Sequence, residues 1–239
     1  EGINILKSKY IDTAQLDSEI LMAKAVDQDR KYIILNNNQN LKEKNLRYFK
    51  SLILKRSRRK PIAYLTNEKY FWNYNFFVTN DTLIPRPDTE LLIEQILKLT
   101  KHRNKMNILD IGVGSGCILL TILKERKNFY GTGVDISKNC INISKINAKN
   151  LNLINRVRLY KTDVDKFAQG KYDLIVSNPP YIKKFNLKYL EKEIVSFEPK
   201  LALCGGLDGL SEIRKVIKKS SELIKKNGKF ILEIGFDQK

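Results

Sequence analysis

From residue 107 onward, short apolar runs alternate with stretches whose apolar positions recur at helical spacing. The runs of strand length lie at 107–111, 130–134, 157–160, 172–177 and 229–234. The helical stretches between them lie at 117–123, 138–150 and 208–226. Continuous apolar strands that alternate with helices are typical of a sheet buried on both faces. The pattern therefore predicts an α/β fold with a doubly wound, mostly parallel, Rossmann-like sheet.

The first 69 residues instead predict a small helical domain. One helix is expected after a cap at Asp12 or Thr13, with apolar positions at Leu16, Ile20, Met22, Ala23 and Val26. A second is expected from Asn40, with Glu43 as its capping-box partner, and ends before Pro61. Its apolar side carries Leu41, Leu46, Phe49, Leu52 and Ile53.

An aromatic segment follows at 70–78, and its Asn73-x-Asn75 centre predicts a β-hairpin. We expect three parts: a substrate-recognition domain at 1–69, a hairpin linker at 70–84, and a catalytic domain at 85–239. Just after the linker, Arg86 stands between two prolines on a rigid segment, where it can meet the carboxylate of a ligand or of a structural acid. Asp88 or Thr89 is expected to cap the next helix.

Composition removes several classes of function. No apolar run reaches the roughly 18 residues that span a bilayer, and the first residues lack a signal-peptide pattern, so we expect a cytoplasmic monomer without a membrane partner. The three cysteines are widely spaced, which argues against a disulfide framework or a zinc site. The single histidine, His102, lies among basic residues and is expected to be exposed. The single histidine therefore argues against a Ser-His-Asp hydrolase and a histidine-ligated metal centre, and we expect no metal.

The net charge of +18 predicts an acidic partner such as nucleic acid or the ribosome, unless it reflects the Lys-, Asn- and Ile-rich composition alone. The basic residues gather at the end of the second predicted helix. They are Lys55, Arg56, Arg58, Arg59 and Lys60. This cluster is either a contact for a polyanion or a solvated helix end.

A glycine-rich turn between the first strand and its helix predicts a site for a nucleotide-like ligand, because glycines let the ligand approach the backbone and the helix start offers free N–H groups. Its residues are Gly112, Val113, Gly114, Ser115 and Gly116. The spacing differs from the dinucleotide-binding pattern. Asp135 ends the next strand, about twenty residues on, where a carboxylate can accept hydrogen bonds from ribose hydroxyls.

The third strand ends at Asp163 and Val164, which can contact an adenine amino group and ring; a capping role for Asp163 is the alternative. After the fourth strand come Asn178, Pro179, Pro180 and Tyr181. The prolines hold an extended turn rich in acceptors, so the Asn178 side chain and a backbone carbonyl can accept the two N–H protons of a planar amide or exocyclic amine. Tyr181 would pack on its face. A plain turn is the alternative.

These motifs resemble known ones. Asp110 to Gly116 is similar to motif I of class I S-adenosylmethionine-dependent methyltransferases, and Asn178 to Tyr181 is similar to their amino-methylating motif. The string from Leu83 to Glu90, the hairpin, and Phe197-Glu198-Pro199 resemble the HemK/PrmC family of protein-(glutamine-N5) methyltransferases, which act on peptide chain release factors. The resemblance covers nearly the whole chain.

The resemblance implies S-adenosylmethionine as cofactor, release factors as protein substrates, and methylation of the glutamine in their Gly-Gly-Gln motif. It places the methionine contacts at Gly112 to Gly116, the ribose contact at Asp135 and the adenine contacts at Asp163 and Val164. The substrate loop is placed at Asn178 to Tyr181, with Asn178, Pro179 and Tyr181 as catalytic residues and Asn178 also as a cofactor contact. Two departures are a valine where relatives often have a large aromatic, and a catalytic domain that is shorter at its C-terminal end. The alternatives are a nucleic-acid amino-methyltransferase acting on a flipped base and a non-catalytic binding module.

Overall fold

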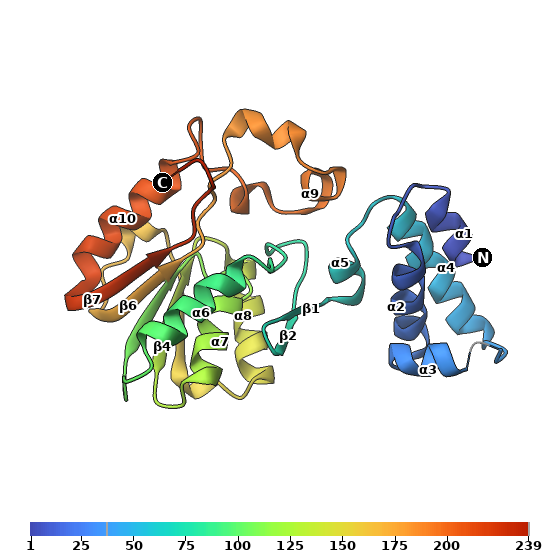
Figure 1. The fold of residues 1–239 in the computed structure, drawn as a ribbon, viewed down its shortest axis with the longest axis horizontal. Helices are drawn as coiled ribbons and strands as arrows, with labels where there is room; N and C mark the ends of the chain where they lie inside the picture. The colour runs from blue at the N-terminus through green and yellow to red at the C-terminus, as the bar shows by residue number, and fades with distance from the viewer. Residues whose placement is uncertain (37, 239) are drawn as a thin grey trace. The chain divides into compact units, whose positions relative to one another are not determined.

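Figure 1 shows a computed structural model of the chain, which describes residues 1–36 and 38–238. The chain divides into two compact units, Glu1–Asn67 and Glu68–Lys239. Each has its own hydrophobic core. Within the described residues, no helix combines the length and apolar composition that crossing a membrane requires.

The N-terminal unit is helical. Its helices are α1 (Gly2–Lys7), α2 (Ala14–Val26), α3 (Arg30–Leu35), α4 (Glu43–Ser57) and α5 (Ile62–Thr66). Leu6, Leu21, Phe49, Leu52 and Ile53 form most of its core. The apolar side that was predicted for the second long helix therefore does face the core at its three C-terminal positions.

Two details of these helices differ from the prediction. The expected apolar face of α2 is wrong at Leu16, which is 41% exposed, because α2 turns Asp17 and Ser18 inward together with Leu21. The capping box at Asn40 is also wrong: α4 begins at Glu43, and no side-chain hydrogen bond caps it.

The basic cluster at the end of α4 is partly structural. Arg56 Nε lies 2.7 Å from Asp17 Oδ2, and both side chains are buried. Arg59 donates to the carbonyls of Lys9 and Tyr10. A polyanion contact is therefore the wrong interpretation for these two arginines, because an internal carboxylate and internal carbonyls already hold them. Lys55 and Arg58 remain exposed.

The second unit begins with an antiparallel hairpin of β1 (Glu68–Phe71) and β2 (Tyr74–Phe77). Phe71 pairs with Tyr74, so the turn is centred on Trp72 and Asn73, and the predicted Asn-x-Asn centre is wrong. Trp72 adopts a positive φ of 57°, a conformation fixed by its backbone N–H, which donates to Glu90 Oε1 at 2.8 Å. Phe71 and Phe76 pack into the core of this unit.

The main sheet has five strands, in the order β5-β4-β3-β6-β7, and every pair is parallel. The strands are β3 (Asn107–Ile111), β4 (Tyr130–Asp135), β5 (Val157–Lys161), β6 (Tyr172–Ser177) and β7 (Ile224–Leu232). The predicted fold class is confirmed. The last strand starts earlier than expected, through an irregular register beside Tyr172 and Leu174.

Helices cover both faces of this sheet (Figure 1). Side chains of α6 (Thr89–Leu99), α7 (Cys117–Glu125) and α8 (Lys138–Asn150) pack with Ile108 on one face. Side chains of α10 (Ser211–Leu223) pack with Leu109 on the other. The segment between β6 and α10 carries the short helices η3 (Lys184–Tyr189), α9 (Lys192–Phe197) and η4 (Lys200–Ala202). Because the strands are parallel, their carboxyl ends meet at one edge, where such sheets bind ligands.

Candidate active site

The glycine-rich turn after β3 is held against β4. The N–H groups of Gly112 and Val113 donate to the Val134 carbonyl at 2.9 and 3.0 Å. Gly112, Gly114 and Gly116 all have positive φ, a conformation that side-chain-bearing residues rarely adopt. A Cβ built on Gly112 would meet no atom within 4 Å, so the space beside the turn is open. The turn therefore offers bare backbone to a ligand.

Asp135 supports this turn directly. Its Oδ2 accepts from Gly114 N at 2.9 Å and its Oδ1 from Ser137 N at 2.8 Å. Burial raises the pKa of Asp135, and these two N–H donors oppose the shift. Each carboxylate oxygen has a second lone pair, so the side chain retains acceptor capacity. The sequence predicted only a ligand-binding role for Asp135. The structure shows that its side chain also holds the glycine-rich turn in place through Gly114.

Asp110 was part of the glycine motif but not among the predicted site residues. It lies on β3 and is buried, and neither of its oxygens has a hydrogen-bond partner in the described part of the chain. Burial raises its pKa to about 7, and the nearby Asp135 charge adds to this. An acid inside an apolar strand, just before a glycine turn, was the signal that could have identified it.

The third strand end has a different character. Asp163 Oδ1 accepts from Asp165 N at 3.0 Å and so caps the short helix η2 (Val164–Lys166). Val164 packs against the core that contains Ile111 and Val134. The alternative prediction, that Asp163 caps a helix, is therefore confirmed for its Oδ1 atom. Contacts of Asp163 and Val164 with a cofactor stay predictions.

The Asn178 loop is fixed at its start and at its side chain. Ser177 Oγ donates to the Ile111 carbonyl at 2.6 Å, which joins the ends of β6 and β3. Asn178 Nδ2 donates to Thr89 Oγ1 at 3.2 Å. Because the nitrogen faces Thr89, the side-chain oxygen Oδ1 is left to accept a hydrogen bond from a ligand. Thr89 belongs to the Leu83–Glu90 string and was expected only as a helix cap.

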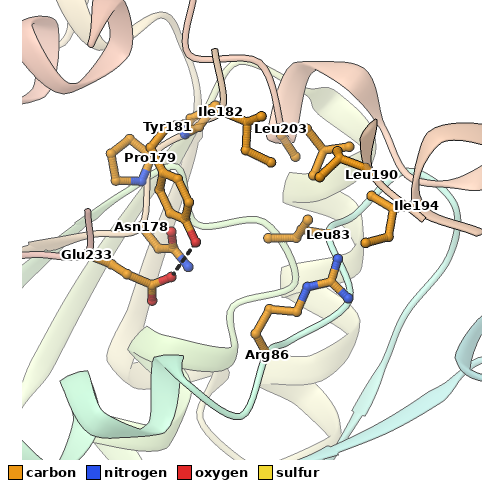
Figure 2. Close-up of a pocket in the computed structure, with 12 residues that line it drawn as sticks. Leu83, Arg86, Asn178, Pro179, Tyr181, Ile182, Leu190, Ile194, Leu203 and Glu233 are labelled. Carbon is orange, nitrogen blue, oxygen red and sulfur yellow. Dashed lines mark hydrogen bonds between the residues drawn. The ribbon is translucent and has the colours of Figure 1, made fainter. Parts of the chain in front are cut away.

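A cavity of about 140 Å³ adjoins this loop (Figure 2). It is lined by Leu83, Arg86, Asn178, Pro179, Pro180, Tyr181, Ile182, Leu190, Ile194, Ala202, Leu203 and Glu233. All four residues of the predicted substrate loop thus share one cavity. The glycine turn and Asp135 do not line it, so the two predicted groups of site residues occupy neighbouring places along the strand ends.

Glu233 is a second residue that sequence reasoning missed. It follows β7, and its backbone N–H donates to the Ser177 carbonyl at 3.0 Å. Tyr181 Oη donates to Glu233 Oε1 at 3.3 Å (Figure 2). Burial raises the pKa of both the Tyr181 hydroxyl and the Glu233 carboxyl. Nothing in the sequence around the last strand signals this acid.

Arg86 meets a structural acid. Its Nη2 lies 2.6 Å from Glu198 Oε1, and Ile84 N donates to Glu198 Oε2 at 3.4 Å. Glu198 comes from the Phe197-Glu198-Pro199 segment, 112 residues away in the chain. The pair therefore joins two walls of the cavity.

Comparison with known proteins agrees with this geometry. Residues 87–197 match the family model "Methyltransferase small domain", and residues 1–66 match "PrmC N-terminal domain". A parallel sheet with a glycine turn and an Asn-Pro-Pro-Tyr loop at its carboxyl edge is, on this match, a methyltransferase domain.

Relatives narrow the class to one family. A release factor glutamine methyltransferase of Buchnera aphidicola subsp. Acyrthosiphon pisum is 39% identical over 99% of this chain and 84% of its own length. That of Clostridium botulinum is 37% identical over 100% and 86%. That of Caulobacter vibrioides is 35% identical over 98% and 81%. This chain belongs to the release factor glutamine methyltransferase family, and the resemblance seen in the sequence is confirmed.

The residues present fit S-adenosylmethionine, which carries a cationic sulfonium, a cationic amino group and a ribose. The turn at 112–116 provides open backbone, and Asp135 retains acceptor capacity of the kind that ribose hydroxyls require, so its ribose contact stays a prediction. Asp110 provides a buried carboxylate whose oxygens have no donor among the described residues, and a cationic group nearby would compensate it.

Proposed function

We propose that this chain transfers a methyl group from S-adenosylmethionine to the side-chain amide nitrogen (N5) of the glutamine in the Gly-Gly-Gln motif of peptide chain release factors. One observation carries the proposal: Asn178 Nδ2 donates to Thr89, which leaves the Asn178 oxygen available beside a cavity lined by Pro179 and Tyr181. The relatives, which are named for this reaction, supply the acceptor.

The cavity wall addresses the main chemical difficulty, which is that an amide nitrogen is a poor nucleophile because its lone pair is delocalised. S-adenosylmethionine supplies, when bound, a methyl group on a cationic sulfonium. Asn178 Oδ1 and the Pro179 carbonyl accept the two N–H protons of the glutamine amide and aim its nitrogen. As positive charge develops on that nitrogen, both acceptors interact with it more strongly, which lowers the barrier.

Tyr181 positions the acceptor rather than reacting with it. Its ring lines the cavity, where it can pack on the flat face of the amide (Figure 2). Its hydroxyl is engaged by Glu233 Oε1 at 3.3 Å, and this hydrogen bond limits rotation of the ring. Pro180 and Pro179 lack N–H groups, so neither competes for the acceptors.

The decisive experiment is the variant Asn178→Ala. It should retain fold and cofactor affinity but lose about 10² to 10³ in kcat, the scale for removing one aligned polar group from a transition state. Asn178→Asp keeps acceptor oxygens and should retain part of the activity. Asn150→Ala, at an exposed position of α8, is the matched control and should leave kcat unchanged.

The acceptor is identified by mass spectrometry after incubation with labelled S-adenosylmethionine. The label should reach the Gly-Gly-Gln glutamine of a release factor, and replacing that glutamine should abolish it. Label in the bases of RNA or DNA, with an unmodified release factor, would replace this function with nucleic-acid methylation. A release factor acts in translation, so the proposal also places the enzyme in the cytoplasm.

For the N-terminal unit we propose recognition of the protein substrate. It is compact in itself, matches a separate family model, and contains none of the catalytic-loop or glycine-turn residues. Lys55 and Arg58 are exposed and can contact an acidic surface of the release factor or the ribosome. Reversing both to Glu should raise KM for the release factor, less so at high salt, with unchanged cofactor affinity. The control variant replaces the exposed Lys24 and Lys31 with Glu. An equal rise in KM in the control would show that net charge, and not a contact of Lys55 and Arg58, causes the effect.

A further inference from the structure

Glu233 places a carboxylate beside the proposed catalytic loop. Its backbone N–H is bonded to Ser177, the residue before Asn178, and its Oε1 accepts from Tyr181. Figure 2 shows the Asn178 amide beside the hydrogen bond between Tyr181 and Glu233. The Glu233 carboxylate therefore lies next to Asn178 and Tyr181, the two side chains that would hold the acceptor.

Its second oxygen is unsatisfied. Glu233 Oε2 is buried and has no hydrogen-bond partner among the described residues. The guanidinium that lines the same cavity, Arg86, is engaged by Glu198 at 2.6 Å. A buried carboxylate oxygen without a donor costs free energy, so its presence beside the proposed catalytic loop needs an explanation. Burial raises the pKa of Glu233, while Thr89, Tyr181 and Asn178 partly oppose the shift.

The Asn178 amide has two orientations, and only one suits the reaction. With Nδ2 donating to Thr89 and lying beside the Glu233 carboxylate (Figure 2), its oxygen is available to the acceptor. The flipped amide would turn Oδ1 toward the carboxylate, where two oxygens repel, and would present N–H groups to the N–H groups of a glutamine amide. Thr89 alone does not prevent the flip, because a hydroxyl both donates and accepts. A carboxylate accepts only, so it distinguishes the two orientations.

We propose that Glu233 is a positioning residue that keeps the Asn178 oxygen directed at the acceptor amide and holds the Tyr181 ring against that amide. The inference rests on the proposed function. Glu233 acts through these two side chains and does not itself touch the transferred methyl group. An alternative, in which Glu233 takes a proton from the methylated nitrogen, gives a different outcome in the test below.

The test is a double-mutant cycle with Glu233→Gln, which keeps the shape of the side chain but adds an N–H donor, and Asn178→Ala. In the wild-type background, Glu233→Gln should lower kcat about tenfold to a hundredfold, the scale of a hydrogen bond to a charged group. KM for the release factor and the calorimetric affinity for S-adenosylmethionine should change less than about twofold. In the Asn178→Ala background, the same change should lower kcat much less, by no more than Tyr181→Phe does in the wild-type background, because only the contact of Glu233 with Tyr181 is left to lose.

Tyr181→Phe is the second variant, since it removes the hydroxyl bonded to Glu233 and keeps the ring. It should give a smaller loss of kcat than Glu233→Gln. Asp237→Asn is the matched control: this carboxylate lies four residues further on, pairs with Lys183 at the surface, and should leave kcat unchanged.

A wild-type kcat in Glu233→Gln would overturn the positioning role. An equal loss of kcat in the wild-type and Asn178→Ala backgrounds would also overturn it, and would indicate that Glu233 acts independently of Asn178, for example by proton transfer. The acceptor assay on wild-type enzyme separates this result from the proposed function. If wild type labels another acceptor, the function fails, and the cycle is then run on that acceptor.

Discussion

The ion pair between Arg86 and Glu198 should be worth far more to stability than an ordinary surface pair. The Glu198 side chain is 2% exposed and that of Arg86 33% exposed, with 2.6 Å between Nη2 and Oε1. In Arg86→Met, which keeps the aliphatic stem, Glu198 would retain only the long contact from Ile84 N at 3.4 Å. Breaking a fully buried pair costs about 3 to 5 kcal/mol and an exposed one about 0 to 1. Because water reaches the arginine side, we expect about 2 to 3 kcal/mol.

The two partners of this ion pair should differ in how much stability is lost when each is replaced. Glu198→Gln removes the buried charge itself and keeps an acceptor for Ile84, so it should cost only about 1 kcal/mol, as for a neutral hydrogen bond. Urea unfolding of the full chain, followed by a probe in the second unit, measures both values. Lys98→Ala is the control: its pair with Glu94 spans 3.8 Å with side chains 69% and 45% exposed. Equal costs for Arg86→Met and Lys98→Ala would refute the reasoning.

Three further predictions concern the strand ends. Asp135→Ala should weaken S-adenosylmethionine binding by about 1.5 to 3 kcal/mol in calorimetry, with unchanged affinity removing Asp135 from the site. Gly205→Ala should lower kcat, because a Cβ there would lie 2.6 Å from the Gly209 carbonyl oxygen and 2.7 Å from that of Pro180, and so would displace the proposed catalytic loop; wild-type kcat would contradict this. The folded-state pKa of Asp110 is about 7, above an unfolded value of about 4, so the native state holds the proton more tightly and stability falls as pH rises from about 4 to 7. Asp110→Asn should make the free energy of unfolding depend less on pH, as measured by urea unfolding of the cofactor-free protein at pH 5 and 8. An equal change in the free energy of unfolding in wild type and variant would exclude Asp110 as the source of the pH dependence.

Periodicity located the sheet well because its strands are buried on both faces, as Ile108 and Leu109 are, and such runs read as continuous apolar segments. The short helices α1, α3 and α5 escaped prediction, since five or six residues are too few to display a helical period. The face of α2 was misjudged because Asp17 is buried against Arg56, and a pairing across 39 residues leaves no local trace.

The residues of the candidate site also divide into those that local sequence motifs predicted and those that only the fold brings to the site. Gly112, Asp135 and Asn178 belong to motifs whose residue types and spacing predict a binding or catalytic role. Arg86 was expected to meet a carboxylate, but only the fold shows which one. Glu233 had no signal at all, because it follows an ordinary apolar strand, and its place in the site depends on the lateral order of β6 and β7.

That lateral order has an electrostatic consequence. β3, β6 and β7 are neighbours, so the catalytic loop after β6 is flanked by Asp110 on one side and Glu233 on the other. Both acids are buried, and both carry oxygens that no donor among the described residues satisfies. Two such carboxylates destabilise the protein alone but stabilise cationic groups placed between them. S-adenosylmethionine is cationic at its sulfonium, and the attacked nitrogen becomes positive as the methyl arrives. We therefore expect the charges that the proposed reaction brings to these strand ends to offset the electrostatic cost of the two buried acids.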